Sequence, residues 1–253
     1  MKKIKISSEI TYFLAIALLS LAVAILSAAD FGISMIVAPA YLLSLKTGVF
    51  SFGQAEYAIQ AGLFIVLCLV LRRFKLVYLS SFITCLVYGA ALDLWRLIPF
   101  FNPAVTAPGS MATPLRVAMY ISGVLLTSFS VALFFKSYLY PQVYDFFVKA
   151  VSERYKVKLS ALKTGVDLSL LATSVIMSLC FFKKFVGIGW GTLIMAPING
   201  TLIGRFSRFL DKTCDFPPRF QQFAALFALE ESPAPAACAY AGVAESSGKH
   251  AGN

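Results

Sequence analysis

The pentamer Leu45-Lys46-Thr47-Gly48-Val49 returns unchanged at residues 162–166 of this chain. An identical pentamer is rare by chance in 253 residues, so the two copies indicate an internal repeat. Each copy is followed by an apolar run, at residues 55–71 and 167–182, then by a basic break and a second apolar run. Another apolar run precedes each copy. The sequence therefore predicts two diverged halves.

A shift of 111 residues aligns the two halves beyond the pentamer. It places Arg72 on Lys183 in the basic breaks, and Gly89 on Gly200 in the runs that follow. We expect three apolar spans in each half, at residues 10–29, 55–71, 76–98, 115–135, 166–182 and 186–204. The first half covers residues 1–100, a connecting loop covers 101–114, the second half covers 115–210, and a disordered tail covers 211–253.

Composition points to a membrane protein. The chain is 59% hydrophobic and only 13% charged, whereas about a quarter of the residues of a soluble domain are charged. Its apolar runs approach the roughly 20 residues that a helix needs to cross a bilayer. They lack the alternation of apolar and polar residues that is typical of the strands of a membrane β-barrel. We therefore expect an all-α, polytopic membrane bundle of about six transmembrane helices.

Two segments do not fit the pattern of simple spans. Residues 31–45 are too few to cross, and Pro39 lacks a backbone donor. They form either a re-entrant segment shielded by protein or an interfacial amphipathic helix. Residues 142–163 have an apolar face and a basic face, which predicts an amphipathic helix along the membrane. That helix contacts either lipid headgroups or a cytoplasmic partner.

The distribution of Lys and Arg predicts the orientation. With an uncleaved first span and a cytoplasmic N-terminus, 17 of the 22 Lys and Arg residues lie on the cytoplasmic side, as the positive-inside rule requires. The run at residues 10–29 is longer than a signal-peptide core, so we expect it to be retained. Because each half has three spans, an odd number, the second half enters the membrane inverted relative to the first. Both termini are then cytoplasmic.

Several functional classes receive no support. The net charge of +10 comes from residues at the edges of spans, so no nucleic-acid partner is predicted. The one histidine, His250, lies in the tail, and the five cysteines show no CxxC spacing. No phosphate-binding loop, HExxH or GxSxG motif occurs. We predict no enzyme activity, no cofactor and no metal site.

Polar residues within spans are the candidates for function, because they are costly in lipid. Asp93 and Arg96, with Trp95 between them, close the third span. They form either a charged gate with an aromatic wall or an ion pair that anchors the end of the span. Glu56 and Gln60 lie one turn apart at the start of the second span, facing either a polar cavity or the headgroups.

In the sixth span, Pro197 and Asn199 interrupt an apolar run, and Trp190 lies at its beginning. Such interruptions either coordinate a solute, as in transporters built from inverted repeats, or kink the helix for packing. The candidate substrate-binding residues are Asn199, Trp190, Asp93, Trp95, Arg96, Glu56 and Gln60. The candidate structural or gating residues are Pro39, Pro197, Gly48, Gly165, Gly89 and Gly200.

The motifs Phe31-Gly32-Ile33, Thr47-Gly48 and Arg72-Arg73, with Gly89 and Asp93, give the chain a family resemblance. In the second half the same likeness runs from Thr164-Gly165 through residues 187–192 to Asn199-Gly200. Residues 8–210 thereby resemble the YczE/YyaS/YitT group of bacterial membrane proteins. Many members carry Pro-Trp-Asp after the first glycine-rich turn, where this chain has Ser34-Met35-Ile36, so a role tied to that acidic residue does not transfer.

The resemblance implies a transporter or permease of the bacterial inner membrane. We expect alternating access of a small, unidentified solute to a site between the repeats, in a protein surrounded by lipid. The alternative is a membrane scaffold or accessory factor that docks a cytoplasmic partner through residues 142–163 and the tail. The small residues of the sixth span also suit a homodimer.

Overall fold

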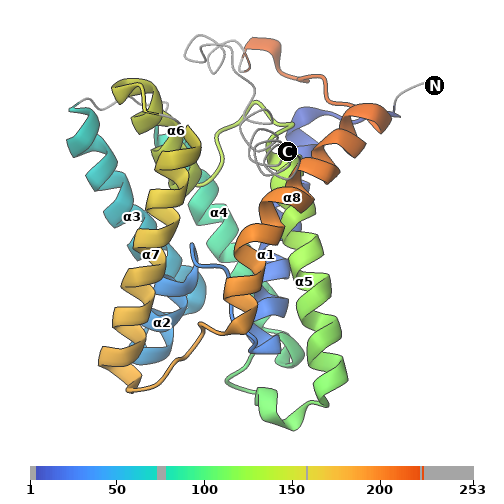
Figure 1. Cartoon of the computed structure of the whole chain (residues 1–253). Coiled ribbons are helices and arrows are strands. Elements are labelled where there is room, and N and C mark those ends of the chain that lie inside the picture. The colour runs from blue at the N-terminus through green and yellow to red at the C-terminus, as the bar shows by residue number, and fades with distance from the viewer. Residues whose placement is uncertain (1–3, 73–77, 158, 223, 225–253) are drawn as a thin grey trace, which may run out of the picture.

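The computed structural model describes residues 4–72, 78–157, 159–222 and 224. This part of the chain is mostly helical (Figure 1), as the sequence predicts. The α-helices are α1 (Ser8–Ala29), α2 (Ala38–Thr47), α3 (Phe52–Leu71), α4 (Leu79–Arg96), α5 (Thr113–Phe134), α6 (Val143–Tyr155), α7 (Leu159–Phe182) and α8 (Trp190–Thr213). The short elements are the 3-10 turns η2 (Pro99–Phe101) and η3 (Pro108–Ser110) and the strands β1 (Ile4–Lys5) and β2 (Cys214–Asp215).

Four helices of the described chain are long and apolar enough to cross a membrane. They are α1, α3, α5 and the Leu162–Phe182 part of α7. Two of the six predicted spans do not reach this standard. α4 contains serine, threonine and tyrosine and ends with Asp93 and Arg96, while the second half of α8 carries Arg205, Arg208 and Asp211. The beginning of the predicted third span, residues 76–77, lies outside the described residues.

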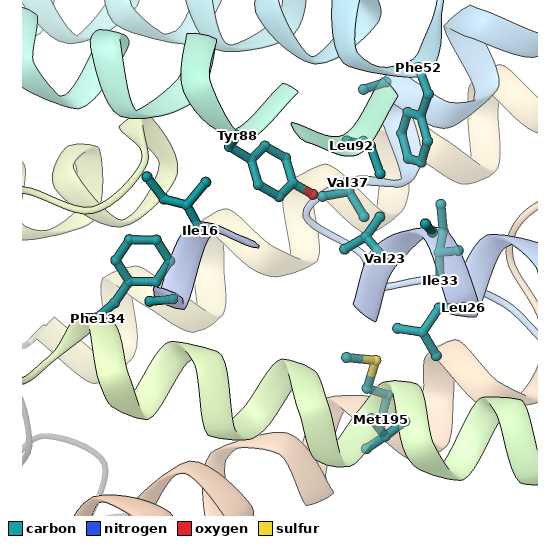
Figure 2. Close-up of a cluster of buried hydrophobic side chains, with 14 of the residues drawn as sticks. Ile16, Val23, Leu26, Ile33, Val37, Phe52, Tyr88, Leu92, Phe134 and Met195 are labelled. Carbon is teal, nitrogen blue, oxygen red and sulfur yellow. The ribbon is translucent and has the colours of Figure 1, made fainter. Parts of the chain in front are cut away.

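The centre of the molecule is the packing of α1 against α5. In the most apolar stretch of α1, 56% of residues are buried, against 11% in α7, so α1 is central and α7 is peripheral. Figure 2 shows Ile16, Val23 and Leu26 of α1 packed among side chains from the surrounding helices, which include Tyr88 of α4 and Phe134 of α5. All five are at most 5% exposed.

The helix contacts recur in pairs. α1 packs on α4, and α5 packs on α8; α3 packs on α6, and α7 packs on α2. The four helices α1–α4 correspond in order to α5–α8. Under this correspondence the contact of α1 with α4 becomes that of α5 with α8, and the contact of α3 with α6 becomes that of α7 with α2. The relation is incomplete, because α3 packs along α4 whereas α7 and α8 lie apart (Figure 1), and the contact of α4 with α6 has no counterpart of similar size between α8 and α2 in the described chain.

Short helices line the ends of α3 and α7 in the same way. The Tyr155 hydroxyl at the end of α6 donates to the Val70 carbonyl of α3 at 2.9 Å. The Lys46 ammonium near the end of α2 lies 5.9 Å from the ring centroid of Phe181 in α7. Val70 and Phe181 are related by the shift of 111 residues that places Arg72 on Lys183, six fewer than the 117 residues that separate the pentamers. The repeat in the sequence thus corresponds to a repeat in the contacts.

The two pentamers themselves differ in structure. In the first copy, α2 ends at Thr47 and Gly48 takes the left-handed conformation, with φ of 61°. The second copy, including Gly165, lies inside α7. The helix ends that do agree are those of α3 and α7, because Arg72 (φ 49°) and Lys183 (φ 54°) are both left-handed. Identical local sequence is overridden here by tertiary packing.

The predicted single amphipathic helix over residues 142–163 is wrong. α6 ends at Tyr155, Lys156 takes the left-handed conformation, and α7 begins at Leu159. The chain has to reverse there, because Tyr155 is held at the end of α3 and α7 runs back past α6 and α2. Val143 and Tyr144 are buried, so the beginning of α6 lies within protein.

The segment at residues 31–45 is an irregular stretch followed by α2. Pro39 lies in the first turn of α2, where its missing N–H costs nothing, so it begins the helix instead of interrupting it. The first residues of α2, including Ala38, Tyr41 and Leu42, are buried. The helix is therefore enclosed by the rest of the fold over its first turns.

Two glycine-containing segments cross where the halves meet. The Ile33 N–H donates to the Gly187 carbonyl at 3.0 Å, and the Gly191 N–H donates to the Phe31 carbonyl at 2.9 Å. Gly32 has φ of 111° and Gly187 has φ of 67°, conformations that other residues rarely adopt. This crossing fixes the stretch before α2 against the stretch before α8.

The chain ends are joined on one face. β1 pairs in parallel with β2, and the Glu9 carboxylate accepts the N–H groups of Arg219 and Phe220 at 2.9 and 3.0 Å. The Tyr138 hydroxyl also donates to Glu9, and burial together with this bond raises the pKa of Tyr138 to about 12. The predicted tail thus begins later than residue 211, because α8 and β2 continue the fold. The predicted disorder of residues 225–253 lies outside the described residues.

α3 and α4 cross at two glycines, Gly53 and Gly89. A Cβ atom at Gly53 would overlap the Gly89 carbonyl oxygen and would lie 2.6 Å from a carboxylate oxygen of Asp93. A Cβ atom at Gly89 would overlap the ring of Tyr57. By contrast, a Cβ atom at Gly62 of α3 would meet nothing within 4 Å.

We predict that Gly53→Ala destabilises the protein by about 1–3 kcal/mol, because the carbonyl that it overlaps belongs to the backbone and cannot rotate away. Gly62→Ala is the matched control on the same helix and should be neutral or slightly stabilising. Thermal unfolding of both variants in detergent measures the difference. Equal melting temperatures would show that the crossing is looser than described.

Candidate functional site

A cavity of about 70 Å³ lies where α2 and α6 begin. Ser34 and Val37 reach it from the start of α2, and Gln142, Tyr144 and Asp145 reach it from the start of α6. The remaining wall comes from α1, α4, α5 and α8, through side chains that include Val23, Tyr88, Thr127, Val131 and Asn199. Both groups of helices that the sequence repeat relates therefore contribute to one cavity.

Three polar groups on this wall are buried without a hydrogen-bond partner among the described residues. They are the hydroxyls of Tyr88 and Thr127 and the side-chain nitrogen of Gln142. In Figure 2 the Tyr88 ring extends from α4 with its hydroxyl directed toward Val37. A buried unpaired polar group costs about 1–3 kcal/mol. Three such groups at one cavity indicate a place where a polar ligand or water completes the hydrogen bonds.

Asn199, a predicted site residue, does line the cavity. Its Oδ1 atom accepts a hydrogen bond from the Ser128 hydroxyl of α5 at 2.7 Å. This bond joins α8 to α5 at the depth of the cavity. α8 is helical through position 197, so the predicted interruption at Pro197 does not divide the helix.

Glu56 and Gln60, the other predicted pair, are completely buried and lie behind the cavity wall. Gln60 Nε2 donates to Glu56 at 3.0 Å and to the Gln142 side-chain oxygen at 3.3 Å. Gln60 Oε1 accepts the first N–H of α6, that of Val143, at 3.2 Å. The Tyr144 hydroxyl donates to Glu56 at 3.4 Å. This pair therefore holds the beginning of α6 in place and contacts two cavity residues.

A charged cluster adjoins the cavity on the α7 side. The Lys163 ammonium lies 2.8 Å from a carboxylate oxygen of Asp145 and 3.4 Å from one of Asp167. Asp145 is the one of these three that lines the cavity. One ammonium is therefore shared by two carboxylates, with the shorter contact to Asp145.

The predicted group at the end of α4 lies away from the cavity wall and ties helices together. Asp93 accepts the N–H of Gly53 at 2.8 Å and the hydroxyl of Ser51 at the start of α3. Trp95 Nε1 donates to a carbonyl of α1 at 3.2 Å, and the Arg96 guanidinium lies 5.4 Å from the Phe52 ring centroid. These contacts suit anchoring residues.

The remaining predicted residues also have places apart from the cavity wall. Trp190 is 81% exposed at the beginning of α8. Gly48 ends α2, Gly165 lies within α7, Gly89 lies at the crossing of α3 and α4, and Gly200 follows Asn199 in α8. No functional role of these residues follows from their positions.

Sequence reasoning missed Tyr88, Thr127, Gln142 and Tyr144. The polar cluster Thr127-Ser128 within an apolar span was a usable signal, because polar side chains in spans usually face a cavity or another helix. Gln142 was placed at the start of a surface helix, so its burial was not foreseen. Tyr88 next to Gly89 carries no signal of its own.

The fold and the cavity define a class: a helical protein with four membrane-compatible helices and a mostly apolar cavity that carries several polar groups and is lined by helices of both halves. Residues 6–208 match the model of a family that is described as "Family of unknown function (DUF6198)", and the chain belongs to that family. No curated protein and no solved structure matches the chain.

Asp93 provides a test of the anchoring role. We predict that Asp93→Ala destabilises the protein by about 1–3 kcal/mol, because two donors at the start of α3 lose their acceptor. Asp93→Asn keeps one oxygen for these donors and should lose less. Thermal unfolding of the two variants measures the effect. An unchanged melting temperature for Asp93→Ala would leave the gate hypothesis as the better account of Asp93.

Proposed function

We propose that this protein moves a small solute across the bacterial inner membrane by alternating exposure of the cavity at the start of α2 and α6. The observation that carries the proposal is the set of three unpartnered buried groups, Tyr88, Thr127 and Gln142, at that cavity. A purely structural interior would pair such groups or replace them with apolar ones. The proposed relatives are the YczE/YyaS/YitT proteins that the sequence resembles.

The paired helix contacts support two inverted repeats, α1–α4 and α5–α8. In this proposal α4 and α8 also cross the membrane, which brings the crossings to six. Their polar residues are tolerable because α4 packs between α1 and α3, and α8 packs on α5. Inverted repeats with a site at their interface are the architecture of many secondary transporters.

The contacts of α2 and α6 support re-entrant segments. α6 begins beside Gln60, near the middle of α3, and ends beside Val70 at its end. α2 begins at the same cavity and has Lys46 beside Phe181, at the end of α7. Each short helix thus begins within the bundle and returns to the face from which its chain entered. Helices interrupted at the level of the site hold solutes in transporters of this symmetry.

The pairing of β1 with β2 supports the proposed orientation. The two strands flank the whole set of helices, so both ends of the bundle lie on one side and the number of crossings is even. The excess of basic residues makes that side cytoplasmic. A scaffold that docks a cytoplasmic partner is the rival, and it requires no access to the cavity from either side.

Cysteine labelling tests alternating exposure without knowledge of the solute. The five native cysteines are replaced first, at Cys68, Cys85, Cys180, Cys214 and Cys238. Thr127→Cys then places a thiol on the cavity wall. We expect a membrane-impermeant methanethiosulfonate to label it in both right-side-out and inside-out vesicles, since each conformation opens the cavity to one side.

Ser130→Cys is the matched control. Ser130 is equally buried on α5, but it donates to a backbone carbonyl and does not belong to the cavity lining. It should remain unlabelled from both sides. Labelling of Thr127→Cys from one side only, or from neither, contradicts alternating exposure and favours the scaffold.

A further inference from the structure

We propose that the cavity binds a small monovalent anion, such as a halide, nitrate or formate. The anion would be the transported solute, and that part of the inference rests on the proposed function. The binding of the anion at the cavity does not depend on transport. The argument has three parts: the field of the two helices that begin there, the chemistry of the unpartnered groups, and the balance of charge and space around them.

The first part is the field of α2 and α6. Both helices begin at the cavity wall; neither N-cap residue, Val37 or Gln142, caps its own helix, and in α6 the buried Gln60 accepts the first N–H. The beginning of a helix carries about half a positive charge and N–H groups without partners within the helix. Two such ends at one cavity favour negative charge there, as at other anion sites built from helix N-termini.

The second part is the kind of atom that is unpartnered. The Gln142 side-chain nitrogen can only donate, and the hydroxyls of Tyr88 and Thr127 can each donate. The three side chains come from α6, α4 and α5 and are 7%, 0% and 5% exposed. A ligand that only accepts hydrogen bonds satisfies all three at once. A cation coordinated by the two hydroxyl oxygens leaves the Gln142 nitrogen without an acceptor, and both helix ends repel it.

The third part is charge and space. The carboxylate on the wall, Asp145, has its charge offset by the Lys163 ammonium at 2.8 Å, which it shares with Asp167. The cavity offers about 70 Å³ to the centres of water-sized spheres, and about 10–15 Å³ holds one water molecule, so the ligand is no larger than several water molecules. A compact anion with a single charge suits both the charges around the cavity and its small volume.

The test uses purified full-length protein in detergent at constant ionic strength and pH. Sodium formate, chloride and nitrate are each exchanged for sodium gluconate, whose anion is too large for the cavity, and thermal unfolding is followed. We expect a saturable rise in melting temperature with at least one small anion. Exchange of sodium for potassium or lithium gluconate should produce no rise.

Two variants remove single donors while keeping shape: Tyr88→Phe and Thr127→Val. Each should weaken the apparent affinity for the anion by roughly tenfold, about 1.4 kcal/mol. Without anion, each should melt at or above the wild-type temperature, because an unpaired buried hydroxyl has been removed. A variant that merely damaged the fold would melt lower. Ser130→Ala, which removes a buried hydroxyl already bonded to the Leu126 carbonyl, should leave the affinity unchanged.

Several results overturn the inference: no response to any small anion, a response that follows the cation, or an unchanged anion affinity in both donor variants. The first of these is the result expected if water alone occupies the cavity. Two-sided labelling of Thr127→Cys without an anion response would support alternating exposure and contradict the anion site. An anion response with one-sided labelling would support the anion site and contradict alternating exposure.

Discussion

The constraint on which this structure depends is that a backbone N–H inside a membrane has no water to bind. α2 and α6 both begin within the bundle, so protein must supply what solvent would supply elsewhere. Gln60 does this for α6 by accepting the first N–H of the helix, and that position in turn requires the buried Glu56 beside it. The buried polar residues of α3, Glu56 and Gln60, are thus needed because α6 begins inside the bundle.

The same constraint accounts for the crossing before α2 and α8. The backbone of residues 31–33 is irregular, and it is satisfied by residues 187–192 of the other half. Gly32 and Gly187 allow the two backbones to approach and turn. The side chain of Thr192 closes the crossing by donating to the Ile33 carbonyl at 2.8 Å. The halves are therefore joined by main-chain bonds next to the cavity, in addition to apolar packing.

The sequence predicted the helical class and the positions of the apolar helices well, because long apolar runs leave few alternatives. It did not predict where α6 ends, because the turn at Lys156 depends on α3, which is distant in sequence. It singled out Asn199, Glu56 and Gln60, since polar residues in apolar runs stand out; Asn199 lies on the cavity wall, and the other two lie behind it. It did not identify Thr127, although the polar pair Thr127-Ser128 was a usable signal. Tyr88 carried no signal, because its importance arises from a hydrogen bond that its neighbours do not make.

The strand pair β1–β2 has a consequence for biosynthesis. β1 is made first and β2 follows α8, so this pair forms only after α1 to α8 have been synthesised. Ser8 and Glu9 likewise wait for residues 217–220, whose backbone they bind. Insertion of the early helices cannot draw on these bonds, and the last contacts to form are those that fasten the first helix to the end of the fold.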